Sequence, residues 1–185
     1  MEMSPEEFKN HWITEYYSLI HFSEHAVDLL RISAPSKTFL KTAGLPKDAA
    51  PFLSFGGPRL AAIPSVSHVW KKDAEFERYR MIGSNGSGDP ICIDEDRNGG
   101  VYYLNHDNKW ISIFMNSSVE QLAYSLLAYR KLGEETRKQG KDDDWLNGNI
   151  PPALSQLFIS ELEAIDSKAT DRGTFWNEIL GEFSK

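Results

Sequence analysis

The sequence has one cysteine, no long apolar run and no excess of basic residues, and each absence excludes a class of protein. A single cysteine, Cys92, cannot form an internal disulfide, so the fold must be stabilised by its core. No apolar stretch approaches the ~20 residues that a membrane-spanning helix needs. The first residues are acidic and lack the apolar segment of a secretion signal. These features predict a soluble, cytoplasmic protein.

The charge of the chain is acidic and unevenly distributed. The 20 Lys and Arg residues are outnumbered by 27 Asp and Glu residues, which gives a formal net charge of −7. This balance argues against a nucleic-acid-binding protein, because neutralising phosphates needs an excess of cations. Residues 142–185 hold nine acidic and three basic residues, so nearly all of the imbalance lies in the last quarter of the chain.

Capping signals and apolar spacing predict the helices. Ser4, Pro5 and Glu7 form the reciprocal pattern with which a helix begins. Ser117 and Glu120 repeat the capping box, and an apolar stripe follows them. The expected helices start at Pro5, span Pro35–Ala43, run from residue 117 to about 139, start at Pro151 after a polar linker over 140–149, and cover Phe175–Phe183. The two C-terminal helices are acidic outside and apolar inside, so we expect them to pack onto the domain.

Four runs rich in β-branched and aromatic residues predict the sheet. They cover residues 78–82, 90–93, 101–104 and 110–115, and short segments rich in Gly, Asn and Asp separate them. Strands joined by such short turns pair with their neighbours in the chain. The sequence therefore predicts an antiparallel meander followed by helices, which is an α+β fold.

Two turns look like ligand loops but lack parts that such loops need. Gly83–Gly88 is followed by a strand, whereas a phosphate loop is followed by a helix and carries a lysine. Asp94–Gly99 alternates oxygen-bearing side chains as a calcium loop does, but its twelfth position is Asn105, where a glutamate is needed. We therefore expect ordinary hairpin turns whose Asp and Asn side chains bind the turn backbone.

The cysteine and the histidines form no ordered catalytic set. Cys92 lies in a predicted strand, where an isolated cysteine is usually a small buried apolar residue. His21 and His25 are four residues apart but have no third metal ligand near them. The sequence therefore predicts no catalytic residue, no metal site and no cofactor.

The run Asp142-Asp143-Asp144-Trp145 in the expected linker has three interpretations. Acidic runs are most often solvated linkers. Three adjacent carboxylates are also compatible with a metal clasp. A tryptophan beside an acidic run is typical of a surface that binds a basic partner, because tryptophan is enriched among interface anchors.

An ordered set of short motifs extends over half of the chain. The motifs are Phe39–Pro46, Phe52–Phe55, Ile82-Gly83, Gly88–Asp94, Gly100–Tyr102 and Phe114–Ser118, the last leading into Leu122, Leu126 and Leu127. In this order and spacing, residues from about 35 to 132 resemble the SUKH superfamily, which groups the Syd protein, a herpesvirus family, the yeast glucan-synthesis regulators and bacterial immunity proteins. The entry Asn116-Ser117-Ser118 into the long helix is similar to that of the bacterial immunity branch.

The resemblance implies a fold, a domain and a function. The fold is α+β, with a mainly antiparallel sheet and helices packed around it. Residues 1–185 form a single domain with its core over about 35–135 and an acidic helical extension over 142–185. The implied function is that of a non-enzymatic immunity protein of a bacterial polymorphic toxin system, which occludes a cognate toxin, often a nuclease. A basic toxin would suit the acidic chain.

Other functions and the contact residues stay open at this point. The alternatives are a scaffold or regulator of cell-wall or envelope synthesis, as in the yeast branch, and a small hydrolase built on the glycine-rich turn and Cys92. Neither nucleic acid nor a membrane is expected as a partner, and the oligomeric state is open. The candidate partner-binding residues are Asp94, Glu95, Asp96 and Asp107 in the turns, Tyr102 and Trp110 in the strands, and Asp142, Asp143, Asp144 and Trp145 in the linker.

Overall fold

The computed structural model describes residues 3–56, 62–140 and 142–183. Its helices are α1 (Pro5–Trp12), α2 (Glu24–Asp28), α3 (Ala34–Thr42), α4 (Val66–Trp70), α5 (Val119–Gln139), α6 (Asp142–Leu146), α7 (Pro152–Ile165) and α8 (Phe175–Leu180), with a 3-10 turn η1 at Ala74–Phe76. The strands are β1 (Leu19–Ile20), β2 (Leu45–Pro46), β3 (Asp48–Ala49), β4 (Leu53–Phe55), β5 (Tyr79–Ser84), β6 (Pro90–Asp94), β7 (Gly100–Asn105) and β8 (Ile111–Asn116). The α+β prediction is confirmed. No helix in these ranges is both long and apolar enough to cross a membrane.

The predicted meander forms the centre of the molecule. Six strands pair in the order β3-β4-β5-β6-β7-β8, each antiparallel to the next, while β1 and β2 form a separate pair. The β6–β7 turn has the expected chemistry: Asp94 Oδ1 accepts a hydrogen bond from the N–H of Asp96, and Asn98 and Gly99 have φ values of 54° and 79°. Local turn residues therefore define the register of this hairpin.

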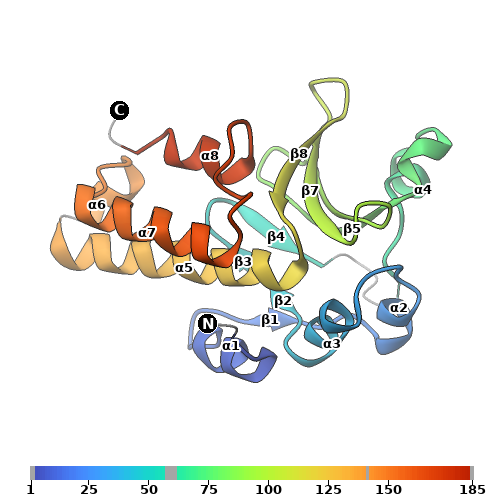
Figure 1. Ribbon diagram of the computed structural model, residues 1–185, viewed down its shortest axis with the longest axis horizontal. Helices are drawn as coiled ribbons and strands as arrows, with labels where there is room; N and C mark the ends of the chain where they lie inside the picture. The colour runs from blue at the N-terminus through green and yellow to red at the C-terminus, as the bar shows by residue number, and fades with distance from the viewer. Residues whose placement is uncertain (1–2, 57–61, 141, 184–185) are drawn as a thin grey trace.

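The two faces of the sheet have different coverings. Ile93, Val101 and Tyr103 belong to the main core, which α5 and α8 complete on one face. Cys92 and Leu104 alternate with them and pack with α4 and η1 on the other face. Figure 1 shows the result, with α5 to α8 on one side of the meander and α4 on the opposite side.

The N-terminal helices dock on the long helix α5. The capping box of α1 is confirmed: the N–H of Glu7 donates to Ser4 Oγ, and the N–H of Ser4 donates to the Glu7 carboxylate. Arg130 of α5 donates to the carbonyl oxygens of His11 and Trp12 at the end of α1, at 2.6 and 2.7 Å. A cation at a helix C-terminus satisfies carbonyls that have no partner within the helix, so α1 is held to α5 by its backbone as well as by its apolar face.

The predicted start of α5 is wrong by one residue. Ser118, not Ser117, caps the helix by accepting a hydrogen bond from the N–H of Gln121. The N–H and hydroxyl of Ser117 instead donate to the carboxylate of Asp166, at 2.6 and 3.1 Å. Glu120 does not complete a capping box; its carboxylate accepts from the hydroxyl of Ser36. Partners distant in the chain thus decide between two adjacent serines.

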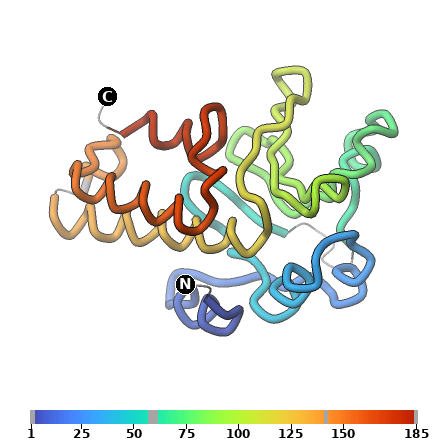
Figure 2. The backbone as a smooth tube through the Cα atoms, viewed as in Figure 1, coloured from blue at the N-terminus to red at the C-terminus, as the bar shows by residue number. Residues whose placement is uncertain are grey.

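The C-terminal helices are part of the main core. Phe158 and Leu162 of α7 and Trp176 of α8 are buried in the same cluster as the sheet and α5. Trp176 also donates from Nε1 to Asn116 Oδ1 at the end of β8, at 2.9 Å. Figure 2 follows the chain from α5 back along itself through α7 and then to α8 beside β8. The prediction that these helices pack onto the domain is confirmed.

The segment expected to be a polar linker contains a helix. Residues Asp142–Leu146 form α6, and Trp145 lies against Gly133 and Tyr129 of α5, with a ring separation of 4.9 Å from Tyr129. The absence of a side chain at Gly133 makes room for the indole, because a Cβ there would lie 3.0 Å from it. The segment, whose composition is typical of a loop, thus packs on α5 through Trp145, which also lies 5.6 Å from the guanidinium of Arg137.

Candidate partner-binding surfaces

The acidic candidates of the β6–β7 turn form internal ion pairs. The side chain of Asp94 is 0% exposed and lies 3.0 Å from Arg78. That of Glu95 is 1% exposed, lies 2.9 Å from Arg80 and accepts a hydrogen bond from the backbone N–H of Arg31. Carboxylates enclosed in this way cannot meet a partner without breaking these pairs, and breaking a pair leaves an uncompensated charge inside the protein.

The other two candidates near this turn differ in exposure. Asp96 is about half exposed and pairs with Arg31 at 3.3 Å. Tyr102 is buried between Phe114, at 5.4 Å between ring centres, and the guanidinium of Arg97, at 5.3 Å. Asp96 is therefore accessible to solvent, whereas the ring of Tyr102 is packed against Phe114 and Arg97 on the face of the sheet opposite to α5.

Aromatic residues distant in the sequence meet at the tip of the β7–β8 hairpin. The ring of Trp110 lies 5.1 Å from Trp70 of α4, which sequence analysis missed, and Lys72 Nζ lies 4.4 Å above Trp110. Trp70 is 39% exposed, and the side chain of Asp107, in the β7–β8 turn, is 86% exposed. We call Trp70, His106, Asp107 and Trp110 the tip surface. Trp70 is exposed and Trp110 is partly buried, and tryptophan is a residue type enriched in binding hot spots.

A buried carboxylate orients the histidine of the tip surface. Asp89 Oδ1 accepts from the N–H of His106 and lies 2.6 Å from its Nδ1, while Asn85 donates to the other carboxylate oxygen. Burial acts to raise the pKa of Asp89, but the hydrogen bonds from His106 and Asn85 outweigh it and hold this pKa below its ordinary value of 3.8. The charged carboxylate thereby joins the β5–β6 turn to the β7–β8 hairpin.

The sole cysteine lies inside the sheet. Cys92 is 0% exposed, and burial, together with the charge of Asp94, raises the pKa of its thiol well above the ordinary value. A thiol reacts as its thiolate, so the position argues against a nucleophilic role. In the described ranges, no group of three or more His, Cys, Asp or Glu residues is arranged to hold a metal ion.

Cys92 is therefore expected to resist alkylation while the protein is folded. Treating the native protein with a thiol reagent at pH 8 should label it at least a hundredfold more slowly than the unfolded protein in denaturant, because both access and ionisation are suppressed. Mass spectrometry of timed samples measures both rates. Labelling of the native protein at a rate near that of the unfolded chain would contradict the buried position.

The acidic C-terminal segment forms a continuous helical layer, which we call the acidic flank: α6, α7, α8 and their connections over residues 143–183. Its exposed carboxylates are Asp143, Glu161, Glu163, Asp171, Glu178 and Glu182, and its exposed cations are Lys168 and Arg172. Of the sequence candidates here, Asp143 is exposed, Asp144 and Trp145 are partly buried, and the side chain of Asp142 lies outside the described residues. Four of these carboxylates, Asp143, Glu161, Glu163 and Glu178, thus lie on helices, and Asp171 and Glu182 lie in the segments before and after α8.

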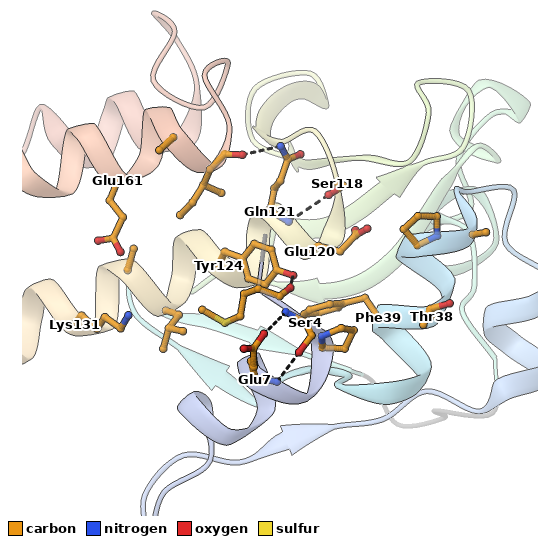
Figure 3. A pocket seen from close by; sticks show the side chains of 18 residues that line it. Ser4, Glu7, Thr38, Phe39, Ser118, Glu120, Gln121, Tyr124, Lys131 and Glu161 are labelled. Atoms are coloured by element: carbon orange, nitrogen blue, oxygen red, sulfur yellow. Dashed lines mark hydrogen bonds between the residues drawn. The ribbon is translucent and has the colours of Figure 1, made fainter. Parts of the chain in front are cut away.

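A groove of about 980 Å³ runs along α5 and is bounded by α1, α3 and α7. Its apolar lining includes Tyr124, Ala164 and the buried residues Phe39 and Leu127. Glu7 and Glu161 also line it, and Figure 3 shows them with Tyr124. The helices that form it come from both ends of the chain. No candidate named from the sequence lines it, because no local pattern indicates which helix faces remain uncovered.

Comparison with known proteins identifies a family. The chain matches the model of the family described as SUKH-4 immunity protein over residues 6–182. No curated protein and no solved structure matches the chain. The matched region extends from α1 through α8, so it includes the N-terminal helices and the acidic flank as well as the meander. It confirms the resemblance to the bacterial immunity branch, and the chain belongs to the SUKH-4 immunity protein family.

Proposed function

We propose that this protein confers immunity by binding a basic protein toxin directly and occluding its active surface, without an enzymatic step. The observation that carries the proposal is the exposed negative charge of the acidic flank, which is held on helices anchored in the core by Phe158 and Trp176. A nuclease is a suitable target, because surfaces that bind phosphates are rich in Lys and Arg.

The charge of the acidic flank is expected to affect the association rate with a charged partner. Complementary fields raise association rates by orders of magnitude and select against partners of like charge. The carboxylates of Asp143 and Glu163 are exposed on separate helices of the flank, so they extend the field over a broad surface. We therefore assign the first encounter with the toxin to the acidic flank, and we treat Asp96 and the tip surface as secondary candidates.

The proposal predicts a strong effect of charge reversal on the flank. In Asp143→Lys/Glu163→Lys, the association rate with the toxin should fall about tenfold at low ionic strength, since two attractive charges become repulsive. The loss should shrink above about 0.1 M salt, where the screening length is about 10 Å. Stopped-flow or surface-plasmon measurements with catalytically inactivated toxin give the rates.

A matched control carries the same change in net charge on the other side of the molecule. Asp73 and Glu75 are exposed beside α4, far from α6 in Figure 1, and Asp73→Lys/Glu75→Lys should alter the rate less than twofold. Equal effects of the two variants would show that the flank influences association only through the net charge of the protein, and would contradict a specific encounter there. If the association rate fell only in the variant with Asp73 and Glu75 replaced, the tip surface would be the site of the encounter.

Neutralisation itself is tested in cells. Co-expression with the toxin encoded beside this gene should restore growth, and the two purified proteins should form a complex. The direct-binding proposal fails if growth is restored while the purified proteins do not associate. It fails as an immunity mechanism if the protein binds the toxin and leaves toxicity unchanged.

A further inference from the structure

The groove along α5 is lined by apolar as well as charged side chains. Pro35 and Ala164 are exposed and Tyr124 is partly buried, while the lining residues Phe39 and Leu127 are each only 1% exposed. The ring of Phe39 meets that of Tyr124 edge to face at 5.8 Å. A volume of about 980 Å³ is at the upper end of the range of ligand pockets, so several side chains fit into it.

Hydrogen bonds hold the walls of the groove in place. The hydroxyl of Tyr124 donates to the carbonyl of Met3, which ties α5 to the chain before α1. Gln121 Nε2 donates to the carbonyl of Ile165 at 2.8 Å and ties α5 to the end of α7 (Figure 3). Because the walls are braced, a ligand entering the groove meets little cost of ordering them.

The charges along the groove favour a cation. Three carboxylates, those of Glu7, Glu120 and Glu161, line it with one ammonium group, that of Lys131. Glu7 and Glu120 lie in the first turns of α1 and α5, where helix dipoles offset part of their charge, and the carboxylate of Glu120 also accepts a hydrogen bond from Ser36 at the start of α3. Glu161 lies near the end of α7, away from any helix N-terminus, so its charge is available to a ligand.

The groove is continuous with the acidic flank. Glu161 belongs to both, and Leu157, which is 66% exposed, lies one helical turn before it on α7. An exposed leucine and a carboxylate on one helix face match a partner that presents an apolar side chain next to a cation. The groove and the flank therefore share one kind of partner surface.

We propose that this groove receives a cationic amphipathic segment of the toxin, with an apolar side chain against Tyr124 and Ala164 and a Lys or Arg at Glu161. This inference rests on the proposed function, because the segment belongs to the toxin that the acidic flank attracts. The flank accelerates the encounter, and the groove supplies the apolar contact that slows dissociation.

Thiol protection tests the assignment in the intact complex. Ala164 lines the groove, Ala74 is exposed in η1 outside both the groove and the acidic flank, and the native Cys92 is buried. In Ala164→Cys, saturating inactivated toxin should slow maleimide labelling at least tenfold, whereas labelling of Ala74→Cys should change less than twofold. A photo-crosslinker attached to the thiol that Ala164→Cys introduces should capture a toxin peptide that carries Lys or Arg next to apolar residues.

The outcomes separate the groove from the proposed function. If Ala164→Cys is labelled as fast in the complex as in the free protein, the toxin does not occupy the groove, although toxin binding itself stands. Capture of an acidic peptide also overturns it. Absence of any complex with the wild-type protein overturns the proposed function itself. Filling the groove by Ala164→Trp gives an independent measurement: toxin should dissociate at least tenfold faster, while Ala74→Trp, outside the groove and the flank, should have less than a twofold effect.

Discussion

Replacing Trp176 with alanine is expected to lower the free energy of unfolding by about 3–5 kcal/mol. The indole is 0% exposed and packs among Tyr129, Phe158 and Phe175, so its removal leaves a large cavity at the centre of the C-terminal helices. The substitution also removes the hydrogen bond from Nε1 to Asn116. Urea denaturation followed by circular dichroism measures the loss.

Trp176→Phe separates the two contributions. It keeps most of the apolar contact and leaves Asn116 Oδ1 without its donor, so the expected loss is about 1–3 kcal/mol. We propose that the chain unfolds as one domain, because the core cluster extends from Phe8 to Trp176. Two resolved transitions in Trp176→Ala, one for the acidic flank and one for the sheet, would contradict this proposal.

Replacing Glu95 with glutamine is expected to lower the free energy of unfolding by about 3 kcal/mol. The carboxylate is enclosed between Arg80 and Arg31, and the neutral amide removes the buried anion of both guanidinium groups, which then keep only their more exposed partners, Glu77 for Arg80 and Asp96 for Arg31. The arginines are partly exposed and can recover some hydration, which keeps the loss at the lower end for a buried pair. Chemical denaturation of the purified variant gives the value.

The adjacent carboxylate provides the control for Glu95. Asp96→Asn changes the same charge one residue away at a half-exposed pair, so a loss below about 1 kcal/mol is expected. Glu95→Gln should bind toxin with unchanged affinity under conditions where it is fully folded, because its carboxylate is inside the protein. If Glu95→Gln had unchanged stability but bound the toxin more weakly, Glu95 would have to be counted among the residues that contact the partner.

Local signals in the sequence determined much of the fold. Ser4 and Glu7 cap α1 as predicted, because both partners lie within one helical turn. Asn98 and Gly99 adopt the positive φ values of the β6–β7 turn, and the four predicted β-runs pair in chain order. Each of these features depends on residues fewer than about 25 positions apart, so periodicity and turn chemistry suffice to indicate them.

Long-range contacts decided what local patterns left open. Asp166 engages Ser117 and leaves the capping of α5 to Ser118, and Gly133 admits Trp145 and so orders α6. The sequence indicated that Asp94 and Glu95 lie in a turn, but it did not show that arginines would enclose them. A turn motif specifies backbone geometry and carries no information about which distant side chain approaches it.

The composition of the sequence by itself determined that the protein is acidic and that the charge is concentrated after residue 141. Only the tertiary structure decided how that charge is used, because the helices of the acidic flank turn their apolar faces to α5 and β8 and their carboxylates to solvent. The same packing leaves one face of α5 open between α1, α3 and α7. Which faces of the helices stay uncovered depends on the positions of all of them together, and no single segment encodes it.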